Sequence, residues 1–390
     1  MDDLPSYSPS SPTPSYSRVP ASGESVLATS PTNFTTPTGT YEKWFGSSRI
    51  ILTGQEDGTT SPSYGRKGVI NGTIEFDDVQ TVEHVRLKLI GKLKSSVTGS
   101  TSCSKSTRIL YQTESVWSRL SEARQGPLSV SFATSFPATF RDGVETRPLP
   151  SSYEIAYAGN PSLSARCSYH LKIIVRYRSS LWPKKKTITI PITYTPRKRP
   201  PQPVLRGCDF RSTVKSLPEE WFETSSILIP QRLHEKPLQA RFYIPAVKIF
   251  GLSDNIPIHI QLKGPVSSLR KFCSCPQTAP TENTPTHKHH SSCTVLTVKL
   301  IRQASIKSLP PTFELSGSHP ESSINGADTT EELEWAGELR CNDNVRVGQF
   351  DAGNVSVRDF VIFSFDSPEQ NYSFSSVPIA LVTDTWSEDV

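Results

Sequence analysis

The chain has 390 residues, which is more than one compact core usually fills, so we expect two domains of about 150–200 residues each. Its 42 Lys and Arg residues exceed its 37 Asp and Glu residues by a net charge of +5, which is too small for a typical nucleic-acid-binding protein. No apolar run approaches the ~18–20 residues that cross a bilayer, which argues against a membrane-spanning protein.

The first 40 residues differ in composition from the rest of the chain. Pro, Ser and Thr make up 23 of them. Such a segment buries too little apolar area to offset the entropy of ordering it, so we predict that residues 1–40 form a disordered tail. The chain starts with a polar, acidic stretch and not with a secretory signal. Seven Cys residues without a disulfide-like spacing fit a reducing compartment, so we expect a cytoplasmic protein.

Two short motifs in this tail are similar to the Pro-Pro-x-Tyr ligand of WW domains. They are Leu4-Pro5-Ser6-Tyr7 and Pro14-Ser15-Tyr16, in which Leu or Thr replaces the first Pro. In such ligands a Pro in polyproline II conformation lies on an aromatic groove, and the Tyr fills an adjacent pocket. We interpret Leu4, Pro5, Tyr7, Pro14 and Tyr16 as candidate WW-binding residues. The alternative is ordinary low-complexity sequence.

From Tyr41 to the middle of the chain, apolar residues alternate with polar ones, which predicts strands with one buried face. The cations of these stretches fall on the opposite face, among them Arg86, Lys88 and Lys172. Pro191 also falls on that face, which indicates an edge strand. The residues expected inside are Val85, Leu87, Leu89 and Leu93, then Leu128, Val130, Phe132 and Phe136, then Tyr169, Leu171, Ile173, Val175 and Tyr177, and then Ile188, Ile190, Ile192 and Tyr194.

The second half of the chain repeats this alternation. A helix of one or two turns is predicted only at Ser216–Phe222, with Ser216 as N-cap and Pro218 in the first turn. The residues expected inside are Leu238, Ala240, Phe242 and Ile244, then Ile258, Ile260 and Leu262, then Leu296, Val298 and Leu300, and then Val355, Val357, Val361, Phe363 and Phe365.

These patterns predict an all-β protein with two antiparallel β-sandwich lobes and less than ~10% helix. The charged, Pro-rich stretch at residues 195–204 is the best boundary between them. We therefore place one lobe at residues 41–199 and the other at residues 200–386, with a linker at residues 200–210. Two long segments, Cys273–Cys293 and Ser316–Thr330, are predicted to be surface loops.

The first of these loops contains thiol and imidazole side chains, which are the ligands that zinc prefers. Their spacing matches no standard zinc finger, so we expect a metal-free polar loop and keep a zinc site as the alternative. The residues are Cys273, Cys275, His287, His289, His290 and Cys293.

Two basic runs are candidate binding surfaces. One consists of Lys184, Lys185 and Lys186, and the other of Arg197, Lys198 and Arg199. Either run suits acidic lipid head groups or a phosphorylated partner tail. The alternative is that the first run is only a solvated hairpin tip and the second only a solvated linker.

The sequence contains none of the short catalytic motifs of hydrolases, metalloproteases or nucleotide-binding enzymes, so we expect a recognition module without enzymatic activity and without a cofactor.

The body of the chain resembles an arrestin-like protein of the α-arrestin, or arrestin-related trafficking adaptor, type and is most similar to fungal members. The matching stretches keep the order they have in the family, over most of residues 41–386. They are Tyr64-Gly65-Arg66 before GVINGTIEF, VRLKLIGKL, FPATF with PLPSSYE, SYHLKIIVRYRSSLW, IPITYTPRKRPPQP, STVKSLPEEWF, FYIPAVKIFGLSDNIPIHIQLKGPVSSLRKF and VPIALVTDTW.

This resemblance implies two arrestin-like β-sandwich lobes and an adaptor role. We also expect a monomer. Such adaptors recruit a WW-domain HECT-type ubiquitin ligase to membrane transporters or receptors for endocytosis, at the plasma membrane or endosomes. The sequence has no intact Pro-Pro-x-Tyr, so ligase binding would depend on the two variant motifs. One alternative is a trafficking scaffold of arrestin fold that binds cargo or coat without a ligase. Another is a metal- or lipid-dependent enzyme on a sandwich fold.

Overall fold

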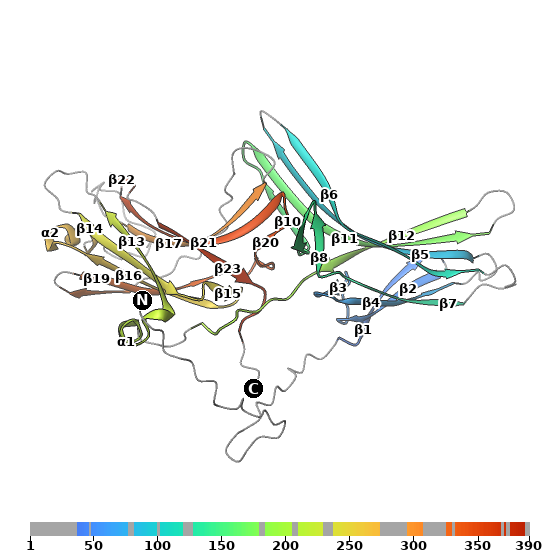
Figure 1. The fold of residues 1–390 in the computed structure, drawn as a ribbon, viewed down its shortest axis with the longest axis horizontal. Helices are drawn as coiled ribbons and strands as arrows, with labels where there is room; N and C mark the ends of the chain where they lie inside the picture. The colour runs from blue at the N-terminus through green and yellow to red at the C-terminus, as the bar shows by residue number, and fades with distance from the viewer. Residues whose placement is uncertain are drawn as a thin grey trace, which may run out of the picture. The chain divides into compact units, whose positions relative to one another are not determined.

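The structure, a computed structural model, is almost entirely β (Figure 1). Strands account for 67% of the described residues and helices for 5%, which confirms the predicted all-β fold class. The described residues are 37–46, 48–76, 82–99, 102–119, 128–178, 184–204, 210–228, 237–273, 295–306, 325–329, 332–367, 370–371 and 375–386.

The first half of the chain, residues 39–194, contributes two facing sheets and a hairpin. One sheet has the order β1-β2-β4-β7. The other has the order β3-β12-β11-β5-β6, with β10 also paired to β11, and β8 and β9 form the hairpin. The strands are β1 (Gly39–Phe45), β2 (Ser48–Gln55), β3 (Ser63–Tyr64), β4 (Val69–Glu75), β5 (Val82–Thr98), β6 (Cys103–Ser118), β7 (Ser129–Ser135), β8 (Thr139–Asp142), β9 (Glu145–Pro148), β10 (Tyr153–Tyr157), β11 (Ser162–Tyr177) and β12 (Lys184–Tyr194).

The predicted alternation is confirmed in this half, because the inward residues of β5, β11 and β12 are buried together in one core with those of the facing sheet. One residue was assigned wrongly. Leu128 is 74% exposed, because β7 begins one residue later and the side chain lies outside the sandwich. Pro191 lies at an edge as predicted, since β12 pairs with β3 only through Thr193 and Tyr194.

The second half of the chain contributes two further sheets, with the orders β13-β14-β16-β19-β18 and β15-β23-β21-β17, and with β20 and β22 paired to β21. Their inward residues form a second core. The elements are α1 (Phe210–Ser216), a 3₁₀ turn (Pro218–Glu220), β13 (Trp221–Leu228), β14 (Leu238–Pro245), β15 (Ile249–Gly251), β16 (Asn255–Lys263), α2 (Val266–Cys273), β17 (Val295–Ile306), β18 (Asn325–Thr329), β19 (Glu332–Arg340), β20 (Phe350–Asp351), β21 (Val355–Ser367), β22 (Gln370–Asn371) and β23 (Ser375–Val382).

The predicted helix at Ser216–Phe222 is wrong in its position. Helix α1 ends at Ser216, where the prediction began, and only a 3₁₀ turn follows it. Pro218 explains the difference, because a proline has no N–H to donate and disfavours a helical residue before it. The aromatic ring of Phe210 holds α1 against the sheet by packing edge-on to Trp221, at 5.0 Å between centroids.

Two predicted loops contain regular structure at their ends. Residues Asn325–Thr329 form β18, paired to β19, although the prediction placed them in a loop. Cys273 is the last residue of α2. The segment that contains the Cys and His residues therefore starts at the end of this helix. The rest of both loops lies outside the described residues.

The two halves share apolar packing. Five residues of the second half pack in the core of the first half. They come from the end of β17, from the residue after β20 and from the start of β21, and they are Ala304, Ile306, Ala352, Val355 and Val357. As a result, residues 37–386 form one compact unit. The domain limits at residues 199 and 200 remain predictions.

Candidate functional site

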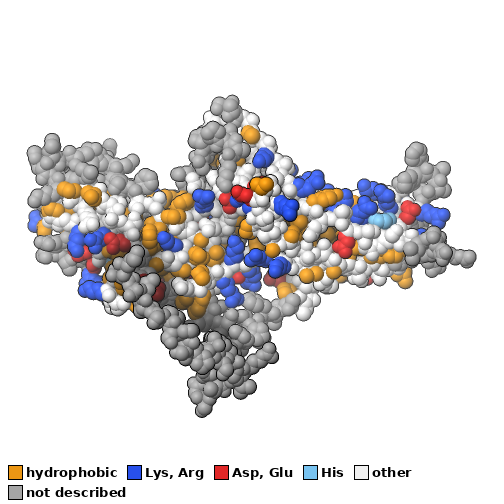
Figure 2. Space-filling model, viewed as in Figure 1, with side chains coloured by type: hydrophobic (Ala, Val, Ile, Leu, Met, Phe, Trp, Pro, Cys, Tyr) orange, Lys and Arg blue, Asp and Glu red, His pale blue; other side chains and the backbone are white. Residues whose placement is uncertain are grey.

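The strongest surface feature is the outer face of the sheet formed by β12, β11, β5 and β6. Because side chains alternate along a strand, the residues between the buried positions of β5 and β11 all point outward. In Figure 2, Lys and Arg side chains gather on the part of the surface that β5, β11 and β12 form. We call this surface the cationic face. It consists of Arg86, Lys88, Lys92, Lys94, Arg108, Arg166, Lys172, Arg176 and Lys185.

Several of these cations lie directly opposite one another across neighbouring strands. Lys88 is the register partner of Lys172, and Lys94 is the partner of Arg166. Lys92 likewise faces Arg108, and Arg176 faces Lys185. Like charges in such positions destabilise a sheet. This arrangement therefore works against stability, and a bound negative charge would relieve it.

The described cross-strand rows of this face contain a single carboxylate, that of Glu154. It lies 3.6 Å from Arg166 at one end of the face, and both side chains are largely exposed. An exposed ion pair of this kind contributes little stability. Among the described side chains, none compensates the positive charge of the rest of this face.

Tyr111 is an exposed aromatic residue within the cationic face. Its hydroxyl accepts a hydrogen bond from Lys88 Nζ at 3.0 Å, and the Arg108 guanidinium lies 4.8 Å from its ring centroid. The hydrogen bond and charge of Lys88 lower the pKa of Tyr111. Burial and the nearby cations lower the pKa of His170, which lies between Lys172 and Arg166 on the same side of β11. Nearby cations contribute to both shifts, after the Lys88 hydrogen bond for Tyr111 and after burial for His170.

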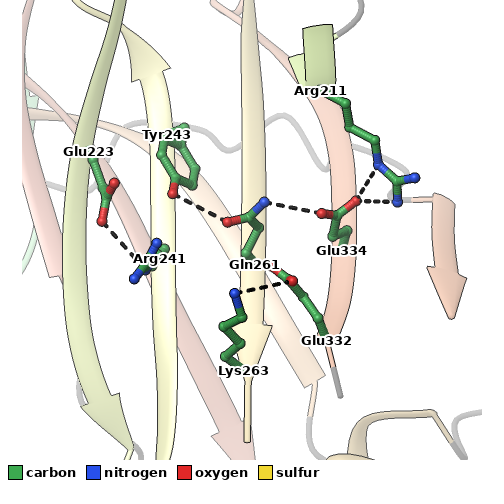
Figure 3. A network of polar contacts seen from close by, with 8 residues as sticks. All are labelled: Arg211, Glu223, Arg241, Tyr243, Gln261, Lys263, Glu332 and Glu334. Carbon is green, nitrogen blue, oxygen red and sulfur yellow. Dashed lines mark hydrogen bonds and ion pairs between the residues drawn. The ribbon is translucent and has the colours of Figure 1, made fainter. Parts of the chain in front are cut away.

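The outer sheet face of the second half is organised differently (Figure 3). Arg241 Nε lies 3.6 Å from Glu223, and Lys263 Nζ lies 3.4 Å from Glu332. Figure 3 also shows Gln261 between Tyr243 and Glu334, with Arg211 of α1 bound to Glu334 at 2.7 Å. Each cation of this network has its own carboxylate. On this outer face, carboxylates of the same face pair with the cations. On the cationic face, most cations have no such partner among the described residues.

The first predicted basic run, Lys184 to Lys186, lies at the start of β12, but only part of it belongs to the cationic face. Lys184 and Lys185 are exposed, and Lys185 faces Arg176. Lys186 points to the other side of the strand. Its Nζ donates a hydrogen bond to the carbonyl of Phe45 at 2.9 Å and lies 4.7 Å from the centre of that ring. Lys186 therefore joins the two sheets, and its part in a binding surface stays a prediction.

The second predicted basic run, Arg197 to Arg199, follows the opposite end of β12. It is tied to the end of β23: Arg197 Nε lies 3.2 Å from an Asp384 carboxylate oxygen, and the backbone of Lys198 bonds with Thr383 and Asp384. The 11 residues of β12 separate the two runs by roughly 35 Å. The two runs therefore do not form a common patch.

The other predicted site residues fall largely outside the described residues. This holds for Leu4, Pro5, Tyr7, Pro14 and Tyr16, and for all the candidate metal ligands after Cys273. Within the described ranges, no group of three or more His, Cys, Asp or Glu side chains is arranged to hold a metal ion.

The sequence analysis missed the cationic face as a site, although it predicted the outward direction of Arg86, Lys88 and Lys172. The alternation of Arg86 and Lys88 with apolar residues is visible in the sequence. The sequence does not reveal that β5 pairs with β11, or that their register places Lys88 opposite Lys172.

No family model matches the chain, and no curated protein matches it. Among the helices in the described ranges, none is long and apolar enough to cross a membrane.

Proposed function

We propose that the protein is a non-enzymatic, arrestin-like adaptor whose cationic face binds acidic segments of membrane transporters or receptors. The observation that carries this proposal is that the described residues of one continuous sheet face include nine cations and one carboxylate. A segment that bears carboxylates or phosphates would relieve the repulsion between cations that face each other across the strands. The positive electrostatic potential of the face would also attract such a segment.

The second part of the proposal is the connection to ubiquitin ligation. In the adaptor model, the tail motifs around Tyr7 and Tyr16 bind the WW domains of a HECT-type ligase, while the cationic face holds the cargo. Bringing both partners to one molecule would direct the cargo to endocytosis at the plasma membrane or endosomes. The support for this part is the sequence resemblance alone, and a trafficking scaffold without a ligase is the second candidate.

The cationic face is tested with the full chain and a fluorescent acidic peptide rich in phosphoserine, with an uncharged peptide of the same length as control. Lys88→Gln with Lys172→Gln removes a facing pair whose side chains are solvent-accessible, so the fold should persist. We expect at least tenfold weaker binding of the acidic peptide and a smaller dependence of its affinity on salt.

Lys263→Gln is the matched control, because it removes one lysine from the self-neutralised face of the second half. It should leave the affinity for the acidic peptide unchanged. Equal losses in both variants, or no loss in the double variant, would contradict a binding role for the cationic face.

A further inference from the structure

A cavity of about 470 Å³ lies where the two halves of the chain meet. The first half supplies the end of β12 and the residues that follow β9, and the second half supplies β20, β21 and the end of β23. This volume is within the ~300–1,000 Å³ range of sites that bind small molecules. The cavity is separate from the cationic face, since it shares no residue with it.

The walls of the cavity are mostly apolar. Leu149 and Tyr194 line it from the first half, and Phe350, Ile379 and Leu381 line it from the second. All of these side chains except Phe350 are buried. Apolar side chains therefore form much of the cavity wall, with Phe350 as the most accessible of these five side chains.

Three exposed cations from separate segments line the same cavity. Arg66 follows β3, Lys198 follows β12, and Arg358 is in β21. Within the described part of the chain, none of the three side chains makes an ion pair. All three therefore add positive charge to the lining of one cavity.

The carboxylates of the cavity are already bound by other cations. An Asp351 carboxylate oxygen is 2.9 Å from Nη1 of Arg147. Arg147 also forms ion pairs with Glu145 and Asp142. Asp359 is paired with Arg302 at 2.7 Å. The residues that line the cavity include four cations, Arg66, Arg147, Lys198 and Arg358, and two carboxylates, Asp351 and Asp359, so their formal net charge is 4 − 2 = +2.

We infer that this cavity binds a small amphiphilic anion, with a carboxylate or phosphate head between Arg66, Lys198 and Arg358 and an apolar body against Leu149, Phe350 and Leu381. The cations compensate the head, and the apolar walls bury the body. Because both halves supply walls and cations, such a ligand would stabilise their contact.

The inference is tested by calorimetry on the full chain with decyl phosphate as the probe, below the concentration at which it forms micelles. Decanol tests the apolar body alone, and inorganic phosphate tests the head alone. We expect saturable 1:1 binding of decyl phosphate and at least tenfold weaker binding of the two partial probes. Arg66→Gln with Arg358→Gln should weaken decyl phosphate binding at least tenfold.

Arg346→Gln is the matched control, since Arg346 is an exposed arginine that lines a neighbouring cavity and not this one. It should bind decyl phosphate like the unchanged protein. Competition by vesicles that contain phosphatidic acid would identify a bilayer lipid as the source of the ligand, and no competition would identify a free amphiphile; either result supports the site. Absence of decyl phosphate binding, equal binding of decanol, or unchanged binding in the double variant would overturn the inference.

Discussion

Arg302 of β17 and Asp359 of β21 lie directly opposite each other and form a buried, two-pronged ion pair. Arg302 Nε and Nη2 donate to the two carboxylate oxygens at 2.7 and 3.1 Å, and Nη1 donates to the carbonyl of Val347 at 2.6 Å. The Asp359 side chain is 0% exposed, and that of Arg302 is 12% exposed. The pair interrupts two otherwise apolar strand faces, near the contact between the halves.

Removing one partner of this pair should be strongly destabilising. Asp359→Asn leaves the Arg302 guanidinium buried without its counter-charge, so we expect the free energy of unfolding to fall by about 3–5 kcal/mol. Urea unfolding followed by tryptophan fluorescence measures this. The control is Arg166→Gln, which removes an exposed pair with Glu154 and should cost less than about 1 kcal/mol.

A replacement of both partners gives a second check on the same pair. Arg302→Met with Asp359→Leu removes both charges, so it should recover most of the stability that Asp359→Asn loses. A double variant that is less stable than Asp359→Asn would mean that the pair is needed for more than mutual neutralisation.

Tyr111 provides a reporter of the potential on the cationic face. Its pKa is lowered because Lys88 donates a hydrogen bond to the hydroxyl and adds a positive charge beside it. Without the ammonium the phenolate loses this support, so Lys88→Gln should raise the pKa of Tyr111 toward its ordinary value of about 10. The difference in ultraviolet titration between each protein and its Tyr111→Phe variant isolates this residue. Lys94→Gln, which changes a row further along β5, should have a smaller effect, and equal shifts would disprove a specific contact with Lys88.

The tail motifs decide between the adaptor and the scaffold. Calorimetry of the full chain with a multi-WW fragment of a HECT-type ligase should show binding that Tyr7→Ala weakens. Two weak sites on one tail strengthen each other through effective concentration, by ~10²-fold when the WW domains are suitably spaced. Tyr7→Ala with Tyr16→Ala should therefore lose more than the two single losses predict. Lys184→Gln is the control and should bind normally. No binding by the unchanged chain would leave the scaffold without a ligase as the better proposal.

Much of the fold could be predicted because burial in a strand is a local, period-two property. The residues assigned to inner faces in β5, β11, β12, β14 and β16 are buried, apart from the half-buried Tyr177. The errors lie at the ends of elements. Strand β7 begins one residue after Leu128, and Pro218 prevents a helix from continuing beyond Ser216. Of the candidate sites, the outward direction of the cationic residues could be predicted, but their assembly into one surface could not.

The sequence by itself determined the all-β class and the buried face of each strand, because apolar alternation needs only the chain's own order. It also contained a signal that was left unused: Arg302 and Asp359 occupy positions where the alternation calls for apolar residues. Only the tertiary structure decided that these two residues face each other, that Lys88 lies against Lys172, and that Arg66 and Arg358 line one cavity. Register and strand neighbours depend on contacts between distant segments, so they follow from how the whole chain packs and not from any local pattern.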